Sequence, residues 1–149
     1  MIKVVKNEFD NLKLENQICF PLYAASNKVI RQYKPFLEKL NLTYTQYITM
    51  MCLWENNQIN VKELGNKLFL DSGTLTPLLK KLEQKGYIKR NRDDGDQRNL
   101  IVTITKQGMD LRNQAKDVPT CVAKCVNLSE EEAINLYKIL YKILENGGK

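Results

Sequence analysis

The sequence contains no histidine. This absence excludes the Cys–His and Ser–His–Asp arrangements that activate many nucleophiles, and it removes the commonest zinc ligand. The four cysteines, Cys19, Cys52, Cys121 and Cys125, are widely separated and include no CxxC pair. That spacing argues against a zinc site built from thiolates alone. We therefore expect no metal site, no cofactor and no enzyme activity.

The sequence also lacks a long hydrophobic run and a signal peptide. The densest apolar stretch, 47–54, is too short to cross a bilayer, and charged residues interrupt the first ten positions. We expect a cytoplasmic protein with no membrane partner, whose cysteines rest as thiols. The chain has 149 residues, 43% of them apolar and 27% charged, which suits one globular domain over 1–149.

Apolar residues recur at helical steps along much of the chain, which predicts a mainly α fold. Two strands, 87–92 and 99–104, flank Asp94-Gly95, a strong hairpin turn signal. A short helix, a second helix and a small β-hairpin in this order form a winged helix-turn-helix. Helices are expected over 12–40 with interruptions at Pro21 and Pro35, 43–54, 61–68, 71–85, 105–117 up to a kink or break at Val118-Pro119, and 129–146.

The start of the helix over 71–85 can be read in two ways. Thr76-Pro77 would make a good cap and first helical residue. A start at Asp71 or Ser72 instead places Pro77 inside the helix and removes a hydrogen bond to the Gly73 carbonyl. We favour the earlier start, with a local distortion.

Positive charge is concentrated between Lys80 and Arg98. This segment contains seven basic and four acidic residues, and its net charge of +3 is half of the chain's net charge of +6. In a winged helix the second helix enters the major groove of DNA and the wing lies along the backbone. A solvated helix face would explain the lysines by themselves, but the topology around them favours double-stranded DNA as a partner. The expected DNA-binding residues are Ser72, Thr74, Thr76, Lys80, Lys81, Arg90, Arg92 and Arg98.

The stretch 70–83, followed by Asp96-Gln97-Arg98 and Ile104-Thr105, resembles the recognition helix and wing of the MarR family of winged-helix regulators. The stretches 14–20, 33–35 and 42–47 resemble its organic-hydroperoxide-sensing branch, OhrR. The resemblance implies a homodimer formed mainly by helices within 12–55 and 105–146, with 58–104 as the winged-helix DNA-binding region. It also implies a repressor that leaves its operator when an organic hydroperoxide oxidises a cysteine.

Carried over residue by residue, the resemblance implies that Cys19 is the sensing thiol and that Tyr23, Tyr33 and Tyr44 surround it. Lys81 and Arg98 match basic DNA-contacting positions. Two-cysteine members of the family use a resolving cysteine on the other subunit. Cys121 and Cys125 lie in that region, slightly offset, and either could form an intersubunit disulfide with Cys19.

The spacing of the sensor residues carries its own information. Cys19 and Tyr23 are four residues apart and share a helix face. Tyr33 lies 14 residues beyond Cys19, or about 21 Å along a straight helix, so a shared site needs Tyr33 from the partner subunit. Pro21 either kinks the helix beside Cys19 or marks a restart, which leaves Cys19 near a helix N-terminus that favours a thiolate.

Three functions compete. The first is a DNA-binding repressor that senses organic hydroperoxides by oxidation of Cys19. The alternative is a MarR-type regulator that responds to a small aromatic or lipophilic ligand without cysteine chemistry. The third, a thiol peroxidase with no DNA role, is disfavoured by the basic wing and by the lack of a catalytic partner set. We favour the first.

Overall fold

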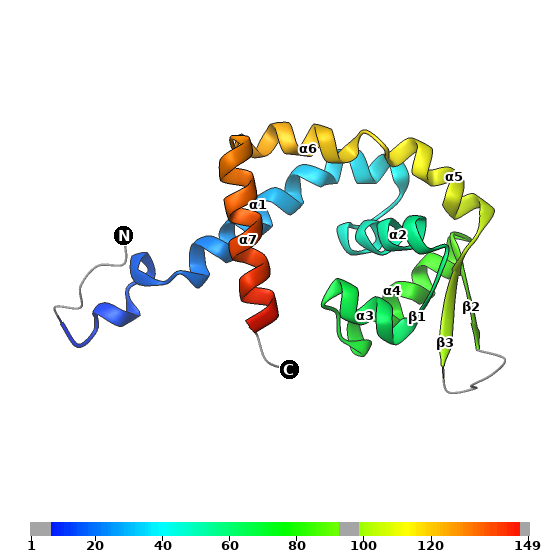
Figure 1. Cartoon of the computed structure of the whole chain (residues 1–149), viewed down its shortest axis with the longest axis horizontal. Helices are drawn as coiled ribbons and strands as arrows, with labels where there is room; N and C mark the ends of the chain where they lie inside the picture. Colours follow the sequence, from blue (N-terminus) through cyan, green and yellow to red (C-terminus); the bar gives the residue numbers. More distant parts are fainter. Residues whose placement is uncertain (1–6, 93–98, 147–149) are drawn as a thin grey trace.

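The computed structural model describes residues 7–92 and 99–146 as a mainly helical chain with one small sheet (Figure 1). Two short 3-10 helices and a third at 38–40 accompany seven α-helices in this part of the chain. The helices are η1 (Asp10–Leu12), η2 (Leu14–Asn16), α1 (Cys19–Leu37), η3 (Glu38–Leu40), α2 (Tyr44–Asn56), α3 (Val61–Leu68), α4 (Ser72–Gln84), α5 (Lys106–Ala115), α6 (Val118–Val126) and α7 (Glu130–Asn146). The strands are β1 (Gln58–Asn60), β2 (Ile88–Arg92) and β3 (Leu100–Ile104).

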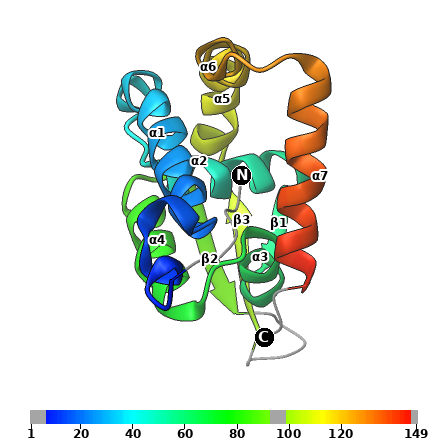
Figure 2. The same cartoon turned by 90° about the vertical axis from the view of Figure 1, so that its left-hand side faces the viewer.

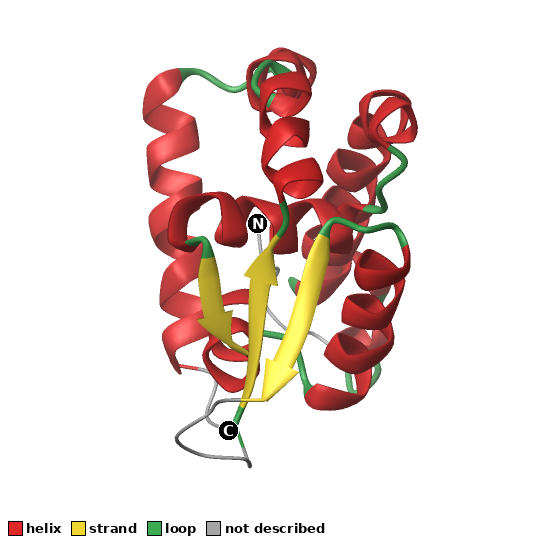
Figure 3. Ribbon diagram, turned by 90° about the vertical axis from the view of Figure 1, so that its right-hand side faces the viewer, coloured by secondary structure: helices red, strands yellow, loops and turns green. Residues whose placement is uncertain are grey.

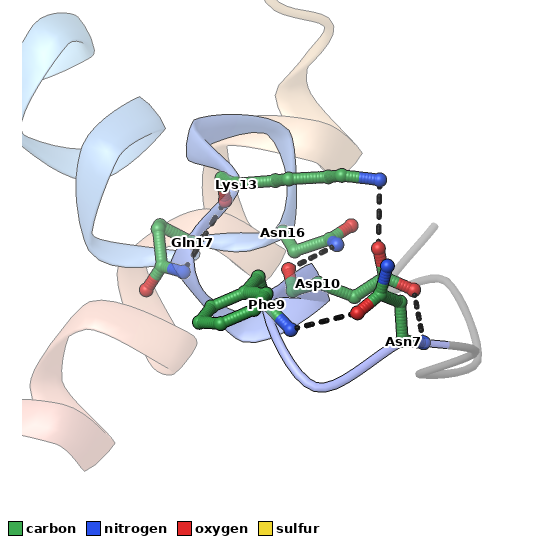
Figure 4. A network of polar contacts seen from close by, with 6 residues as sticks. All are labelled: Asn7, Phe9, Asp10, Lys13, Asn16 and Gln17. Atoms are coloured by element: carbon green, nitrogen blue, oxygen red, sulfur yellow. Dashed lines mark hydrogen bonds and ion pairs between the residues drawn. The ribbon is translucent and has the colours of Figure 1, made fainter.

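The predicted helix over 12–40 is wrong at its N-terminal end. Residues before Cys19 form η1 and η2, held by a local network around Asp10 (Figure 4). The Asp10 carboxylate pairs with Lys13 at 2.7 Å, and its carbonyl accepts a hydrogen bond from the Asn16 side chain at 2.8 Å. Short polar side chains of this kind compete with helix formation by bonding nearby backbone.

Of the two roles considered for Pro21, the structure shows the helix restart. Helix α1 begins at Cys19, so Pro21 lies in the first turn. Backbone N–H groups in a first turn have no partner within the helix, and a proline there removes no helical hydrogen bond. Pro35 lies inside α1 near its end, and the helix continues to Leu37.

The winged-helix unit follows the predicted order. Helix α4 starts early, as expected, with Pro77 inside it and the Asp71 carboxylate accepting the Thr74 N–H at 2.8 Å as the cap. Gly86 ends this region with φ 78°, a conformation that suits glycine. The apolar side of α4 supplies Leu75, Leu79 and Leu82 to the core.

The sheet has one strand more than expected. Strand β1 pairs antiparallel with β3, Ile59 opposite Val102, and gives the order β1-β3-β2 seen in Figure 3. The expected β2–β3 hairpin is present, with Ile88 opposite Ile104. Its turn at Asp94-Gly95 lies outside the described residues. Only three residues of β1 pair, which is too short for a periodic signal in the sequence.

Three helices, α5 to α7, follow the winged-helix unit at the C-terminal end of the chain. The predicted helix over 105–117 ends at Ala115, and α6 starts at Val118 with Pro119 in its first turn. Helix α6 packs along α1, and α7 then descends from the end of α6 on one side of the molecule (Figures 1 and 2). Much of the apolar surface of α7 stays exposed.

Candidate functional site

Cys19 is an exposed thiol at the first residue of α1. Apolar neighbours surround it in the sequence and are exposed as well, Ile18 at 69% and Phe20 at 43%. Tyr23, one turn further along α1, is 68% exposed. An exposed thiol among exposed apolar side chains is accessible from solvent, and it lies where another chain could cover it.

Tyr33 and Tyr44 lie together at the junction of α1 and α2. Their ring centroids are 4.9 Å apart in an edge-on arrangement, and the Tyr47 ring lies 5.9 Å from Tyr33. Burial raises the pKa of Tyr33 and of Tyr44, with the neighbouring Tyr44 adding to the effect on Tyr33. Burial, with the two other tyrosines, raises the pKa of Tyr47 to about 12. These phenols are therefore protonated near neutral pH and able to donate hydrogen bonds.

One chain does not bring the four expected sensor residues together. Cys19 and Tyr23 lie near the start of α1, and Tyr33 lies on the same helix near its other end. The rise of an α-helix puts the Cys19 and Tyr33 backbones about 21 Å apart. The arrangement therefore separates the thiol from the phenol pair within one chain.

The remaining cysteines differ in exposure. Cys52 is buried in α2, as expected for a core residue, and burial raises its thiol pKa. On α6, Cys121 is half-buried beside a cavity of about 280 Å³ that Phe36 and Val118 also line. Cys125 is exposed, and its thiol donates to the Cys121 carbonyl at 3.4 Å. All four cysteines are free thiols in the structure.

The expected DNA-binding residues of α4 lie on its exposed side. Ser72, Thr74, Thr76, Lys80 and Lys81 are all exposed, while the leucines of α4 point into the core. Ser72, Thr76 and Lys80 repeat every four residues and share one face. The Thr74 hydroxyl donates to the Asp71 carboxylate at 3.0 Å, which engages it in the helix cap.

The basic residues of the wing differ from one another. Arg90 of β2 pairs with Glu83 of α4, its Nη2 and Nε lying 2.7 and 3.0 Å from the same carboxylate oxygen. This ion pair joins the wing to α4. Arg92 is exposed, and Arg98 lies outside the described residues.

Two contacts near these sites could not be expected from the sequence. Trp54 donates its indole N–H to the Gly108 carbonyl at 2.9 Å and stacks edge-on against Tyr47, 6.1 Å away. Lys85, which looked like one more cation of the basic stretch, instead reaches the start of α2 and donates to Gln46 at 3.0 Å. Neither contact leaves a local pattern, because both join residues far apart in the chain.

Among the described residues there is neither a candidate metal site nor a helix that could span a membrane. Within residues 7–92 and 99–146, no three Cys, Asp or Glu side chains come together in a way that could hold an ion. None of the helices in the described ranges has the length and apolar character that crossing a membrane requires.

A helix–helix–hairpin unit with an exposed polar helix face and a basic wing defines a winged helix-turn-helix regulator. Residues 31–115 match the family described as transcriptional regulator SarA/Rot, and the chain belongs to this family. The chain is 45% identical over 141 residues to the organic hydroperoxide resistance transcriptional regulator of Bacillus subtilis, covering 95% of this chain and 96% of that protein.

The chain is also similar to solved structures of DNA-binding regulators. Reduced AbfR bound to DNA, a protein of Staphylococcus epidermidis, has a TM-score of 0.74 and 34% identity, covering 93% of this chain and 97% of that one. The same protein in an overoxidised state on DNA also has a TM-score of 0.74, and in a disulfide-formed state 0.63. Escherichia coli MarR on operator DNA has a TM-score of 0.79 at 24% identity, covering 93% and 99% of the two chains. The resemblance to the MarR family, and within it to OhrR, is thereby confirmed, the MarR structure itself showing the fold alone.

Proposed function

We propose that this protein is a dimeric, cytoplasmic repressor that binds operator DNA and releases it when an organic hydroperoxide oxidises Cys19. The observation that carries the proposal is the exposed Cys19 thiol at the start of α1, on an apolar surface that a single chain leaves uncovered. The 45% identity to an organic hydroperoxide resistance regulator supports the choice of oxidant.

A homodimer would complete the sensor. The protonated Tyr33–Tyr44 pair of one copy cannot reach Cys19 of the same copy along α1, so a second copy must supply it. Exposed apolar side chains at both ends of the chain, including Phe9, Leu14, Ile139 and Ile143, offer the surface for such an association. Dimerisation would then use helices of 12–55 and 105–146 and leave 58–104 for DNA.

The chemistry would start at the Cys19 thiolate. The thiolate sulfur attacks the terminal oxygen of the hydroperoxide, the O–O bond breaks, and the products are a sulfenic acid and an alkoxide that takes a proton to become an alcohol. Phenol donors such as Tyr33 and Tyr44 can stabilise the anionic sulfur and the leaving oxygen.

A second thiol would complete the switch. A thiolate from Cys121 or Cys125 of the other subunit attacks the sulfenic sulfur, a disulfide forms, and the hydroxyl leaves with a proton as water. AbfR has been solved on DNA both reduced and overoxidised, and separately in a disulfide-formed state. Those states favour a disulfide, rather than oxidation of one sulfur, as the event that releases DNA here.

DNA binding would use α4 and the wing. The face that bears Ser72, Thr76 and Lys80 would enter the major groove, with Thr74 at its start and Lys81 beside it. Arg92 and Arg98 would contact the backbone beside the wing, while Arg90 would act through its ion pair with Glu83.

The test is a DNA-binding measurement with a labelled duplex from the protein's own promoter, with and without cumene hydroperoxide. Wild type should bind tightly when reduced and lose at least about tenfold in affinity when oxidised, a coupling of about 1.4 kcal/mol. Cys19→Ser should bind but ignore the peroxide. Cys52→Ser is the matched control, because a buried core thiol should not take part.

Release of Cys19→Ser from DNA by peroxide would refute sensing by this thiol and favour the alternative, a regulator that responds to a small aromatic or lipophilic ligand. A non-reducing gel of the oxidised protein tests the disulfide. An intersubunit band should persist in either Cys121→Ser or Cys125→Ser and vanish in the other, while a chain that stays monomeric excludes the intersubunit disulfide.

A further inference from the structure

Lys85 joins the end of α4 to the start of α2. It is the residue that follows the last turn of α4, and its side chain is half-buried. Its ammonium donates to the Asn41 carbonyl, in the loop between α1 and α2, and at 3.0 Å to the Gln46 side-chain oxygen. In the sequence, Lys85 is 44 residues away from Asn41 and 39 residues away from Gln46.

The Gln46 end of this contact lies within the cap of α2. The same Gln46 oxygen accepts the Thr43 N–H at 3.1 Å, and the Thr43 hydroxyl accepts the Gln46 N–H at 3.3 Å, which completes a capping box. Gln46 is only 3% exposed. A buried amide with fixed partners holds the Lys85 ammonium in one place.

The same turn of α2 carries a proposed sensor residue. Tyr44 is the first residue of α2, between Thr43 and Gln46, and its ring contacts Tyr33. A shift of the tyrosine pair would therefore move the capped turn on which Lys85 is anchored. The route runs from Tyr44 through the cap to Lys85 and on to the last turn of α4.

We propose that Lys85 is a positioning residue that couples the sensor tyrosines to α4, and that it does not contact a DNA phosphate. This inference rests on the proposed function. The ammonium of the half-buried Lys85 already donates to two oxygen atoms of the protein, on Asn41 and Gln46. Burial, with nearby Lys81, lowers the Lys85 pKa, as expected for an ammonium withdrawn from water.

The experiment compares Lys85→Met with Lys81→Met, which removes the same charge from the exposed side of the same helix. Affinity for the promoter duplex is measured over a range of salt concentrations, with reduced and with cumene hydroperoxide-treated protein. Loss of one phosphate contact reduces the steepness of the negative slope of log affinity against log salt by about 0.9. Lys81→Met should show that change, and Lys85→Met should keep the wild-type slope.

The coupling is read from the ratio of oxidised to reduced dissociation constants. Lys85→Met should shrink this ratio by about two- to thirtyfold, the range typical for residues that couple two sites. Thiol labelling should show that Cys19 is still oxidised. Lys85→Arg, whose guanidinium can also donate to two oxygens, should restore the ratio.

Hydrogen exchange separates this inference from the proposed function, because it needs neither DNA nor peroxide. Lys85→Met should speed exchange of amides in 41–46 and 82–87. Unchanged exchange, an unchanged ratio of dissociation constants, or a salt slope that is shallower by about 0.9 would each overturn the positioning role. If Lys85→Met loses its helical circular dichroism, Lys85→Gln, which keeps a polar side chain, takes its place with the same expectations. If the wild-type protein fails to bind DNA or to respond to peroxide, the proposed function is refuted, and the coupling role of Lys85 is refuted with it. Faster hydrogen exchange in Lys85→Met would then show only that Lys85 holds α2 and α4 together.

Discussion

At the scale of single residues, Gly108 is where three parts of the structure meet. Its N–H donates to the Thr105 hydroxyl at 3.0 Å, and its carbonyl accepts the Trp54 indole N–H at 2.9 Å. A β-carbon at this position would lie 2.2 Å from the Tyr87 carbonyl oxygen, far inside contact distance. The close approach of α5 to the base of the hairpin therefore depends on a missing side chain.

Gly108→Ala is expected to lower the free energy of unfolding by about 1–3 kcal/mol, the cost typical of an overpacked site. Urea unfolding monitored by circular dichroism measures this change. Gly73→Ala is the matched control, because its β-carbon would meet only one side-chain oxygen of Asp71, at 3.0 Å, and no backbone atom. The control should change stability by less than about 1 kcal/mol in either direction. An equal loss in both variants would remove the special role of Gly108.

At the scale of elements, the ion pair between Glu83 and Arg90 holds the wing against α4. Glu83 accepts three hydrogen bonds from Arg90, including the backbone N–H at 2.9 Å. The Arg90 side chain, followed by its backbone N–H, lowers the pKa of Glu83 below its ordinary value of 4.5. A carboxylate with a lowered folded-state pKa stabilises the fold above its unfolded-state pKa, and this contribution is lost as the pH falls through the folded-state pKa.

Glu83→Gln should therefore lower the free energy of unfolding by about 0.5–1 kcal/mol at neutral pH, as for a partly exposed ion pair. The difference from wild type should shrink when urea unfolding is repeated below pH 4.5. Glu63→Gln serves as control, since its pair with Lys67 is 3.9 Å long and exposed. A Glu83→Gln difference that is the same at both pH values would show that the carboxylate charge does not stabilise the wing.

At the scale of the whole molecule, one chain leaves its terminal helices incompletely covered. Helix α7 exposes Ile134, Tyr137, Ile139 and Ile143, each by 46–61%. Figure 1 shows α7 apart from β2 and β3, and Figure 2 shows it on the opposite side of the molecule from α4. Apolar surface of this extent is typical of an interface between subunits.

Ile139→Glu is expected to weaken the proposed dimer strongly. Burying an isoleucine contributes about 1.5–3 kcal/mol. A twofold dimer contains this residue once in each subunit, so the substitution removes the contribution twice. The dissociation constant should therefore rise by roughly two to four orders of magnitude. Sedimentation equilibrium measures this directly. Lys138→Glu is the control on the same helix and should leave the dimer intact. A monomeric wild-type protein at micromolar concentration would contradict the dimer.

The sensor and the DNA face were predictable to different degrees. The exposed face of α4 follows from its leucine periodicity, so the sequence alone places Ser72, Thr76 and Lys80 on that face. The separation of Tyr33 from Cys19 follows from helical rise alone. Arg90 could not be sorted from the other cations, because its partner Glu83 lies on a different element.

Local hydrogen bonds and periodicity by themselves determined the helices of the winged unit, their caps and their order. Asp71 and Thr105 cap the helices that follow them, and Gly86 lies just after α4. Each acts on backbone within a few residues of its own position, so the local sequence is enough to predict its effect. Only the tertiary structure decided that β1 adds to the sheet, and that Lys85 and Arg90 bind side chains of other elements of the fold. Those contacts join residues distant in the chain, and their free energy depends on packing that no local pattern records.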